Sequence, residues 1–145
     1  MTKGDEFLKL DNQLCFAVYS ASRAIIRAYK PLLDRLEITY TQYIALMVLW
    51  EKDGVTLNYM GKKLGLDSGT LTPLLKKMEK AKLIKRKRDP SDERHINIYL
   101  TQEGKNLKAK ALEIPEQMVC KLPFEFCDIE KLRDTLKNLY QNIKI

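Results

Sequence analysis

The sequence predicts a mainly α-helical fold with one small β-hairpin, and two observations carry this prediction. Apolar residues recur every three or four positions through most of the chain, as they do along one face of a helix. One basic stretch before residue 100 instead alternates apolar and polar residues after a turn signal, as a hairpin strand does. With 145 residues and 45% hydrophobic content, the chain is long enough for one domain with a packed core.

A long amphipathic helix is predicted over residues 11–29, with Asp11 as its N-cap. Pro31 is expected to interrupt this helix and to begin a short second helical segment, because proline suits the first position of a helix. The apolar face of the long helix is formed by Leu14, Val18, Ala21, Ile25 and Tyr29.

The next helix is predicted to begin after Thr39, because Thr39 and Gln42 match a capping box. The run from Ile44 to Trp50 is almost entirely apolar and ends before Gly54. A helix that is apolar on most sides is buried, so we expect this segment to form the centre of the core.

Two short helices are predicted next, separated by Gly65, a residue suited to a helix C-terminus. Asp67 and Ser68 offer N-cap side chains to the second of these helices. That helix turns apolar residues toward a core and places hydroxyl groups, followed by lysines, on its opposite face. Such a face suits a helix whose N-terminal end enters the major groove of DNA. The residues on it are Thr70, Thr72, Lys76, Lys77 and Lys80.

A cationic hairpin follows the second short helix. Residues 85–88 are all Lys or Arg, residues 89–92 form a turn signal, and residues 94–100 alternate apolar and polar side chains. Between Lys76 and Arg94, nine Lys/Arg and four Asp/Glu give a net charge of +5, out of +7 for the whole chain. A basic helix with a basic hairpin beside it predicts a winged helix-turn-helix, in which the hairpin, or wing, reaches toward the DNA backbone or minor groove.

Within the wing, Arg94 is expected to enter the minor groove, with Asp92 holding a neighbouring guanidinium, either that of Arg86 or that of Arg94 itself. The hydroxyl groups of the preceding helix should contact base edges or phosphates, and its lysines should add non-specific attraction. The predicted DNA-binding residues are Ser68, Thr70, Thr72, Lys76, Lys77, Arg86, Arg88, Asp92 and Arg94.

After the wing, Thr101 is expected to cap a helix with Glu103 in its first turn, and Pro115 should kink that helix. The last segment carries a coiled-coil-like seam of apolar residues. We therefore expect one domain over residues 1–145, in which residues 37–101 form the DNA-binding core and residues 1–36 and 102–145 form dimerisation helices. The alternative is that these helices only cover the core of their own subunit. The seam consists of Ile129, Leu132, Leu136, Leu139 and Ile143.

Composition and motifs narrow the function classes. The excess of 26 Lys/Arg over 19 Asp/Glu favours a polyanionic partner, nucleic acid ahead of a membrane surface. The chain has no run of about 18 apolar residues and no signal-peptide core, so a cytoplasmic protein is expected. The three cysteines and the single histidine, His95, lack the paired spacing of a zinc site. No cofactor-binding loop or catalytic constellation is present, so neither a metal, a cofactor nor an enzyme is predicted.

The order of these elements, together with residues 92–94, 100–101 and Gly104, resembles the MarR family of bacterial transcription regulators over essentially the whole chain. Residues 14–16, 29–33, 39–40, 42–43, 49–51 and 66–73 are further similar to the organic-hydroperoxide-sensing repressors of that family. This resemblance implies a homodimer that binds a pseudo-palindromic operator while Cys15 is reduced and releases it when an organic hydroperoxide oxidises Cys15.

The chemistry of the residues around Cys15 agrees with that implication. Cys15 is expected in the first turn of a helix, where backbone N–H groups favour the negative charge of a thiolate. The hydroxyl groups of Tyr19, Tyr29 and Tyr40 are candidates to donate hydrogen bonds to the sulfur, and the resemblance places Tyr29 and Tyr40 in this network, with the partner subunit as one possible source. On residue chemistry alone, Cys15 is a small buried hydrophobe more often than a sensor.

The resemblance also implies a second cysteine that captures the oxidised thiol from the other subunit. Cys120 occupies the corresponding region after the wing, and Cys127 is the competitor. If neither reaches Cys15, a small cellular thiol or over-oxidation would take its place. Two other functions stay open, a MarR-type regulator that responds to a phenolic ligand or acts as a global redox or virulence regulator, and a thiol peroxidase.

Overall fold

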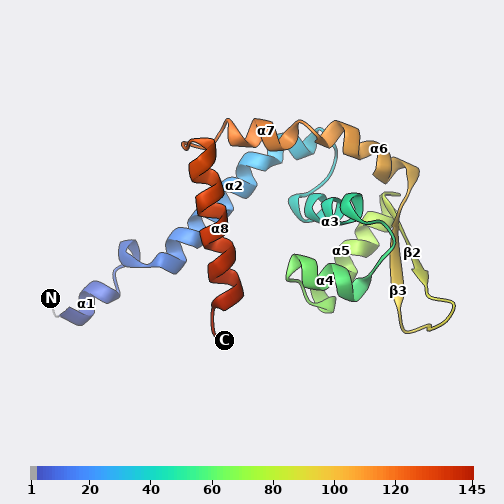
Figure 1. Cartoon of the computed structure of the whole chain (residues 1–145), viewed down its shortest axis with the longest axis horizontal. Coiled ribbons are helices and arrows are strands. Elements are labelled where there is room, and N and C mark those ends of the chain that lie inside the picture. The colour runs from blue at the N-terminus through green and yellow to red at the C-terminus, as the bar shows by residue number, and fades with distance from the viewer. Residues whose placement is uncertain (1–2) are drawn as a thin grey trace. The chain divides into compact units, whose positions relative to one another are not determined.

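The computed structural model describes residues 3–145 and divides into two compact units, Met1–Leu112 and Glu113–Ile145 (Figure 1). Its elements confirm a mainly helical chain with a small antiparallel sheet. The first unit contains α1 (Lys3–Phe7), a 3₁₀ turn (Leu10–Asn12), α2 (Leu14–Asp34), α3 (Tyr40–Glu51), β1 (Val55–Thr56), α4 (Leu57–Leu64), α5 (Ser68–Lys80), β2 (Ile84–Arg88), β3 (Ile96–Leu100) and α6 (Gln102–Ala111). The second unit contains α7 (Ile114–Val119) and α8 (Phe126–Asn142).

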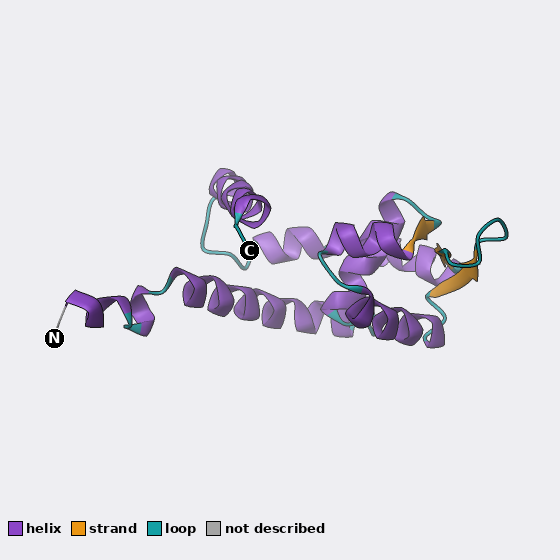
Figure 2. Ribbon diagram, turned by 90° about the horizontal axis from the view of Figure 1, so that it is seen from below, coloured by secondary structure: helices purple, strands orange, loops and turns teal. Residues whose placement is uncertain are grey.

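Helix α2 is one continuous helix, so the predicted interruption at Pro31 is wrong (Figure 2). A proline inside a helix costs roughly 3 kcal/mol relative to alanine. Leu32 and Leu33 directly after it are 6% and 2% exposed, and burying each side chain returns about 1.5–3 kcal/mol, which offsets that cost. The predicted cap is also wrong, because Asp11 lies in the 3₁₀ turn and Gln13 is the N-cap.

Helix α3 forms the centre of the core, as predicted. The capping box is present, since the Thr39 side chain accepts from the Gln42 N–H group and the Gln42 side chain accepts from the Thr39 N–H group. Ala45 and Leu46 on α3 are fully buried. At its end, the Trp50 Nε1–H group donates to the Gly104 carbonyl oxygen at 2.9 Å, which ties α3 to α6.

Helices α4 and α5 form the predicted helix-turn-helix. Gly65 ends α4 with a φ of 65°, a left-handed conformation that glycine adopts without a steric penalty. Asp67 is the N-cap of α5 and accepts from the Thr70 N–H group at 2.7 Å. One face of α5 is committed to the core, since Leu71, Leu75 and Met78 are at most 1% exposed. The other face of α5 is therefore available to a partner.

Strands β2 and β3 form the predicted hairpin, and β1 adds a third strand that the sequence analysis did not include. The strand order is β1-β3-β2, with Val55 opposite Ile98 and Ile84 opposite Leu100. A two-residue strand is too short to show an alternating pattern in the sequence. It forms because β3 offers it a free edge. Asp53, just before β1, links this segment to the end of β3, since its side chain accepts from the Leu100 N–H group at 2.8 Å.

Thr101 caps α6, as predicted, by accepting from the Gly104 N–H group. Gly104 lies so close to the Leu83 carbonyl oxygen that a Cβ atom there would collide with it. The kink expected at Pro115 is wrong. The helix ends at Ala111, and Pro115 lies in the first turn of the separate helix α7, where its missing N–H group has no partner to lose.

In the second unit, α8 has no buried residue. Its predicted seam stays accessible, with Leu132, Leu136 and Leu139 between 40% and 46% exposed. In the first unit, Leu14 and Ile25 on the apolar face of α2 are 68% and 40% exposed. None of the described helices combines the length and apolar character needed to cross a membrane.

Candidate functional site

The outward face of α5 carries the residues predicted to contact base edges and phosphates. Ser68, Thr70, Lys76 and Lys77 are exposed, and Thr72 is half-buried. Hydrogen bonds from Thr70 to the Asp67 carboxylate hold the pKa of Asp67 below its usual value, so this cap stays ionised at neutral pH. The structure therefore presents small hydroxyl groups at the start of α5 and the exposed ammonium groups of Lys76 and Lys77 behind them.

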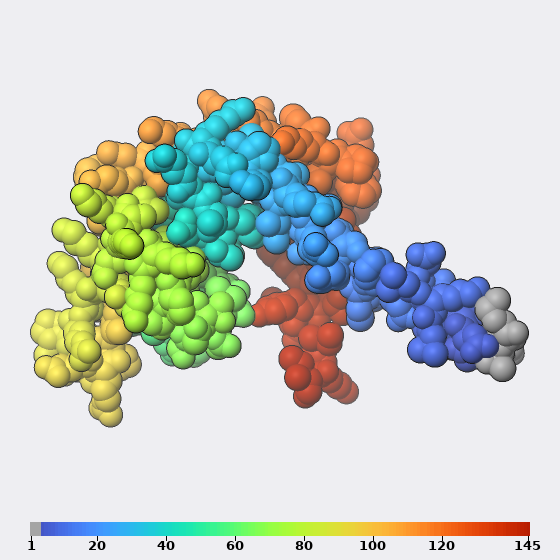
Figure 3. Space-filling view, turned by 180° about the vertical axis from the view of Figure 1, so that it is seen from behind, coloured from blue at the N-terminus to red at the C-terminus, as the bar shows by residue number. Residues whose placement is uncertain are grey.

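The wing projects beyond α4 and α5 (Figures 1 and 3). Near its tip, the Asp92 carboxylate accepts from both the backbone N–H and the Nε–H of Arg94, each at 3.1 Å. The backbone bond first, and the guanidinium second, lower the pKa of Asp92. The Arg94 side chain is 91% exposed, so Asp92 fixes its stem while its terminal nitrogens face solvent.

Arg86 lies inside the wing rather than at its tip. Its backbone N–H and its guanidinium both donate to the Glu79 carboxylate of α5, at 3.0 and 3.1 Å, and its side chain is 22% exposed. Of the two partners proposed for Asp92, the structure thus provides Arg94 and not Arg86. The Glu79–Arg86 pair joins the wing to α5, whereas Arg88 at the end of β2 is exposed.

Cys15 is the second residue of α2, and its thiol is free and exposed. Tyr19 lies one turn later and is 56% exposed. Its hydroxyl accepts from the Arg23 guanidinium at 3.4 Å, and that guanidinium lies 5.3 Å from the ring centroid. Cys15 and Tyr19 are therefore neighbours on an open helix surface.

Tyr29, Tyr40 and Tyr43 form a cluster between α2 and α3, with ring centroids 5.1, 5.8 and 6.4 Å apart. Burial, reinforced by the neighbouring Tyr40 and Tyr43, raises the pKa of Tyr29 to about 12. Burial raises the pKa of Tyr40 and Tyr43 as well. All three phenols are therefore neutral hydrogen-bond donors at neutral pH.

One chain does not bring Cys15 to this tyrosine cluster. Cys15 and Tyr29 are 14 residues apart on the same uninterrupted helix, which separates their Cα atoms by roughly 21 Å at ~1.5 Å per residue. The predicted network of Cys15 with Tyr29 and Tyr40 is thus not assembled within a single subunit.

The two candidate partners of the oxidised thiol both lie in the second unit. Cys120 is the C-cap of α7 and Cys127 is the second residue of α8, and both are free and exposed. Accessibility therefore does not separate the two.

Two residues of these sites were missed by the sequence analysis. Tyr43 belongs to the tyrosine cluster and follows Tyr40 by three positions, a helical spacing that was visible in the sequence. Glu79 had no such signal, because it pairs with Arg86 only once the hairpin folds back onto α5.

Comparisons with known proteins agree with this geometry. The chain matches the family of SarA/Rot transcriptional regulators over residues 27–111. It is 47% identical to the organic hydroperoxide resistance transcriptional regulator of Bacillus subtilis over 138 residues, which cover 95% of this chain and 94% of that protein.

Among solved structures, the chain is similar to AbfR of Staphylococcus epidermidis. Reduced AbfR bound to DNA superposes with a TM-score of 0.79 and 38% identity, over 94% of this chain and 93% of AbfR. AbfR with a disulfide formed superposes with a TM-score of 0.65 and 39% identity, over 94% of this chain and 96% of AbfR. The chain therefore belongs to the SarA/Rot family of MarR-type winged-helix transcriptional regulators, within the group of the organic hydroperoxide resistance regulators.

Proposed function

We propose that this chain is a homodimeric repressor that binds a pseudo-palindromic operator while Cys15 is reduced and releases it when an organic hydroperoxide oxidises Cys15. The observation that carries the proposal is the exposed Cys15 thiol in the first turn of α2, in a chain whose helix-turn-helix and wing are fully formed. Its similarity to a hydroperoxide resistance regulator and to AbfR in reduced and disulfide forms supports the same chemistry.

A dimer is supported by the apolar side chains that a single chain leaves exposed on α2 and α8. A symmetric dimer presents two copies of α5 to two operator half-sites about 34–36 Å apart, one turn of DNA. In such a dimer the tyrosine cluster of one subunit can approach Cys15 of the other, which removes the separation of roughly 21 Å along one α2 helix.

The proposed site selects its oxidant through the tyrosine cluster. The rings of Tyr29, Tyr40 and Tyr43 offer an apolar surface, which favours a lipid-like or aryl hydroperoxide over hydrogen peroxide. Their neutral hydroxyl groups donate hydrogen bonds to the sulfur and to the peroxide oxygens.

The oxidation is a two-electron step at sulfur. The Cys15 thiolate attacks the terminal peroxide oxygen, the O–O bond breaks, and the alkoxide leaves and takes up a proton to become the alcohol. The sulfur becomes a sulfenic acid. A second thiol then attacks this sulfur and displaces water, which gives a disulfide.

We propose Cys120 as that second thiol, with Cys127 as its competitor. Bridging requires Cα atoms within about 7 Å, so a pair that is farther apart in the reduced dimer must move to form the bond. That movement would change the separation of the two α5 helices and release the operator.

The thiol chemistry distinguishes a sensor from a peroxidase. A sensor reacts once per redox cycle, whereas a thiol peroxidase would consume hydroperoxide repeatedly in the presence of a reductant. A regulator of the phenolic-ligand type would instead release DNA with a salicylate-like ligand and keep DNA when hydroperoxide is added.

Non-reducing electrophoresis with mass spectrometry of the cysteines after stoichiometric hydroperoxide tests the proposal. We expect a disulfide-linked dimer that is lost in Cys15→Ser and in Cys120→Ser and kept in Cys127→Ser. Cys15 should still be oxidised in Cys120→Ser. A linked dimer that persists in Cys120→Ser and disappears in Cys127→Ser would identify Cys127 as the second thiol.

A further inference from the structure

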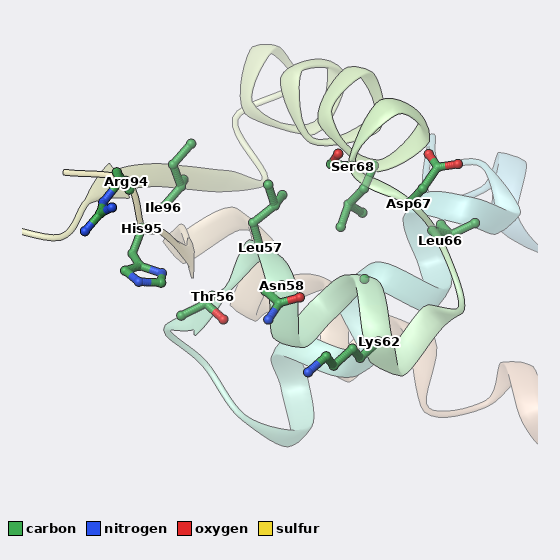
Figure 4. A pocket seen from close by; sticks show the side chains of 12 residues that line it. Thr56, Leu57, Asn58, Lys62, Leu66, Asp67, Ser68, Arg94, His95 and Ile96 are labelled. Atoms are coloured by element: carbon green, nitrogen blue, oxygen red, sulfur yellow. The ribbon is translucent and has the colours of Figure 1, made fainter. Parts of the chain in front are cut away.

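A hollow of about 550 Å³ lies in the first unit between α4, the turn before α5 and the residues leading into β3 (Figure 4). Its rim is polar, with Asn58, Lys62, Arg94 and His95 all exposed. Its floor is apolar and consists of half-buried or buried side chains, namely Leu57, Leu66, Leu71 and Ile96.

The protein neutralises the positive charge of the rim only in part, through Asp92, which lies 3.1 Å from Arg94 Nε and 3.4 Å from His95 Nε2. Within residues 3–145, Lys62 forms no ion pair, and Arg94 binds Asp92 only through its Nε–H and backbone N–H groups. Asp67 is the one acidic residue among those that line the hollow, and its carboxylate is occupied by the Thr70 N–H group at 2.7 Å. The hollow therefore favours an anionic occupant.

The N-terminus of α4 also borders the hollow, with Thr56, Leu57 and Asn58 among its lining residues. The Thr56 hydroxyl accepts from the Tyr59 N–H group at 3.1 Å and so caps α4. The N–H groups of Leu57 and Asn58 come earlier in the first turn, where a helix supplies no carbonyl partner.

The two predicted groove contacts imply that bound DNA passes over this hollow. One sugar-phosphate strand separates a major groove from the minor groove beside it. If α5 enters the major groove and Arg94 the adjacent minor groove, that strand passes between the start of α5 and the wing. Ser68 of α5 and Arg94 of the wing border the hollow on different sides (Figure 4).

We propose that this hollow is a seat for the DNA backbone, in which Asn58, Lys62 and His95 bind the phosphates of the strand that crosses from α5 to the wing. The side chains donate hydrogen bonds to phosphate oxygens, and the deoxyribose carbons pack on the apolar floor. This inference rests on the proposed DNA-binding function and adds three residues to it. A volume of about 550 Å³ is far larger than one inorganic phosphate needs, so a sugar-phosphate segment fits it better.

The sharpest variant is Lys62→Gln, with Lys63→Gln as its matched control. Lys63 is the next residue of α4 and carries the same charge, but it does not line the hollow. Its Nζ atom lies 3.8 Å from Glu51 Oε2. We expect Lys62→Gln to weaken binding of operator and random DNA alike, by roughly tenfold at low salt, and to lower the slope of log affinity against log salt by about one. Lys63→Gln should leave that slope unchanged.

Operators in which one phosphate at a time is replaced by an uncharged methylphosphonate locate the contact. At the phosphate held by Lys62, the losses from Lys62→Gln and from the neutral phosphate should not add, because both remove the same interaction. Asn58→Asp should be non-additive at the same or the next phosphate, since a carboxylate there repels it.

Two results would overturn the seat while leaving DNA binding itself intact. One is a Lys62→Gln protein that equals Lys63→Gln in affinity and salt slope, with the two losses additive at every phosphate. The other is loss of inorganic phosphate binding in Lys62→Gln with unchanged affinity for DNA. Failure of the unaltered protein to bind any DNA would instead overturn the proposed function.

Discussion

The apolar residues of the helix-turn-helix are buried, whereas those of the two long terminal helices are largely exposed. Leu71, Leu75 and Met78 of α5 are at most 1% exposed, whereas Leu132 and Leu136 of α8 are 46% and 40% exposed. Each set follows a regular helical spacing in the sequence, so periodicity alone does not distinguish them. The difference shows that one chain buries the apolar face of α5 and leaves the apolar faces of α8 and of the first part of α2 exposed.

The largest expected effect comes from breaking the exposed seam. Leu132→Asp combined with Leu136→Asp should place two carboxylates in the proposed dimer interface and leave a folded monomer. Since two linked half-sites gain greatly from simultaneous binding, operator affinity should fall on the order of 100-fold or more. Light scattering and operator titration measure these two quantities.

Asn138→Asp with Gln141→Asp is the matched control, because both residues are exposed on the opposite side of α8. A protein that stays dimeric with carboxylates in the seam would show that α8 does not pair subunits.

The next largest effect is expected in the core of the helix-turn-helix and wing, where α6 packs. Gly104→Ala should destabilise the protein by about 1–3 kcal/mol, because the new Cβ would collide with the Leu83 carbonyl oxygen and force α6 away. Denaturant unfolding measures this loss. Gly69→Ala serves as the control, since its Cβ would meet only Asp67, at 3.4 Å, and equal losses in the two variants would contradict the close packing of α6.

A smaller effect is expected where the wing joins α5. Glu79→Gln should cost on the order of 1 kcal/mol, because the Arg86 guanidinium loses a charged partner that is itself 39% exposed and screened by solvent. Affinity for operator and random DNA should fall together, without any change in the response to hydroperoxide. A variant whose wing amides show unchanged hydrogen exchange would disprove the role of this pair.

The smallest effect concerns the tyrosine cluster. An unfolded tyrosine ionises near pH 10, whereas folded Tyr29 keeps its proton up to about pH 12. Its contribution to stability is therefore complete below pH 10 and is lost as pH rises to about 12. Because Tyr29 is half-buried, we expect on the order of 1 kcal/mol, measured as the difference in alkaline unfolding between the unaltered protein and Tyr29→Phe. Identical alkaline profiles would contradict the burial of Tyr29.

Local signals predicted most of the fold. The Thr39 capping box, the left-handed Gly65 and the Asp67 cap each depend on residues within a few positions, so the sequence displays them directly. The interruption predicted at Pro31 is wrong because burial of Leu32 and Leu33 outweighs the local preference of proline against a helix interior.

The candidate sites depend more on residues far apart in the chain. The Glu79–Arg86 pair and strand β1 form only once the sheet has formed. No local sequence signal therefore predicts them. Cys15 was identified as a sensor through the resemblance to the hydroperoxide-sensing repressors, since residue chemistry alone favours a small buried hydrophobe. The length of α2 that separates Cys15 from Tyr29 became clear only once the helix proved continuous.

The central claim is that Cys15 couples oxidation to DNA release, and fluorescence anisotropy of a labelled operator tests it most directly. Stoichiometric organic hydroperoxide should release the operator from the unaltered protein, and a thiol reductant should restore binding. Cys15→Ser should bind the operator with similar affinity and keep it when hydroperoxide is added. Release of the operator from Cys15→Ser at the same hydroperoxide concentration would contradict the account.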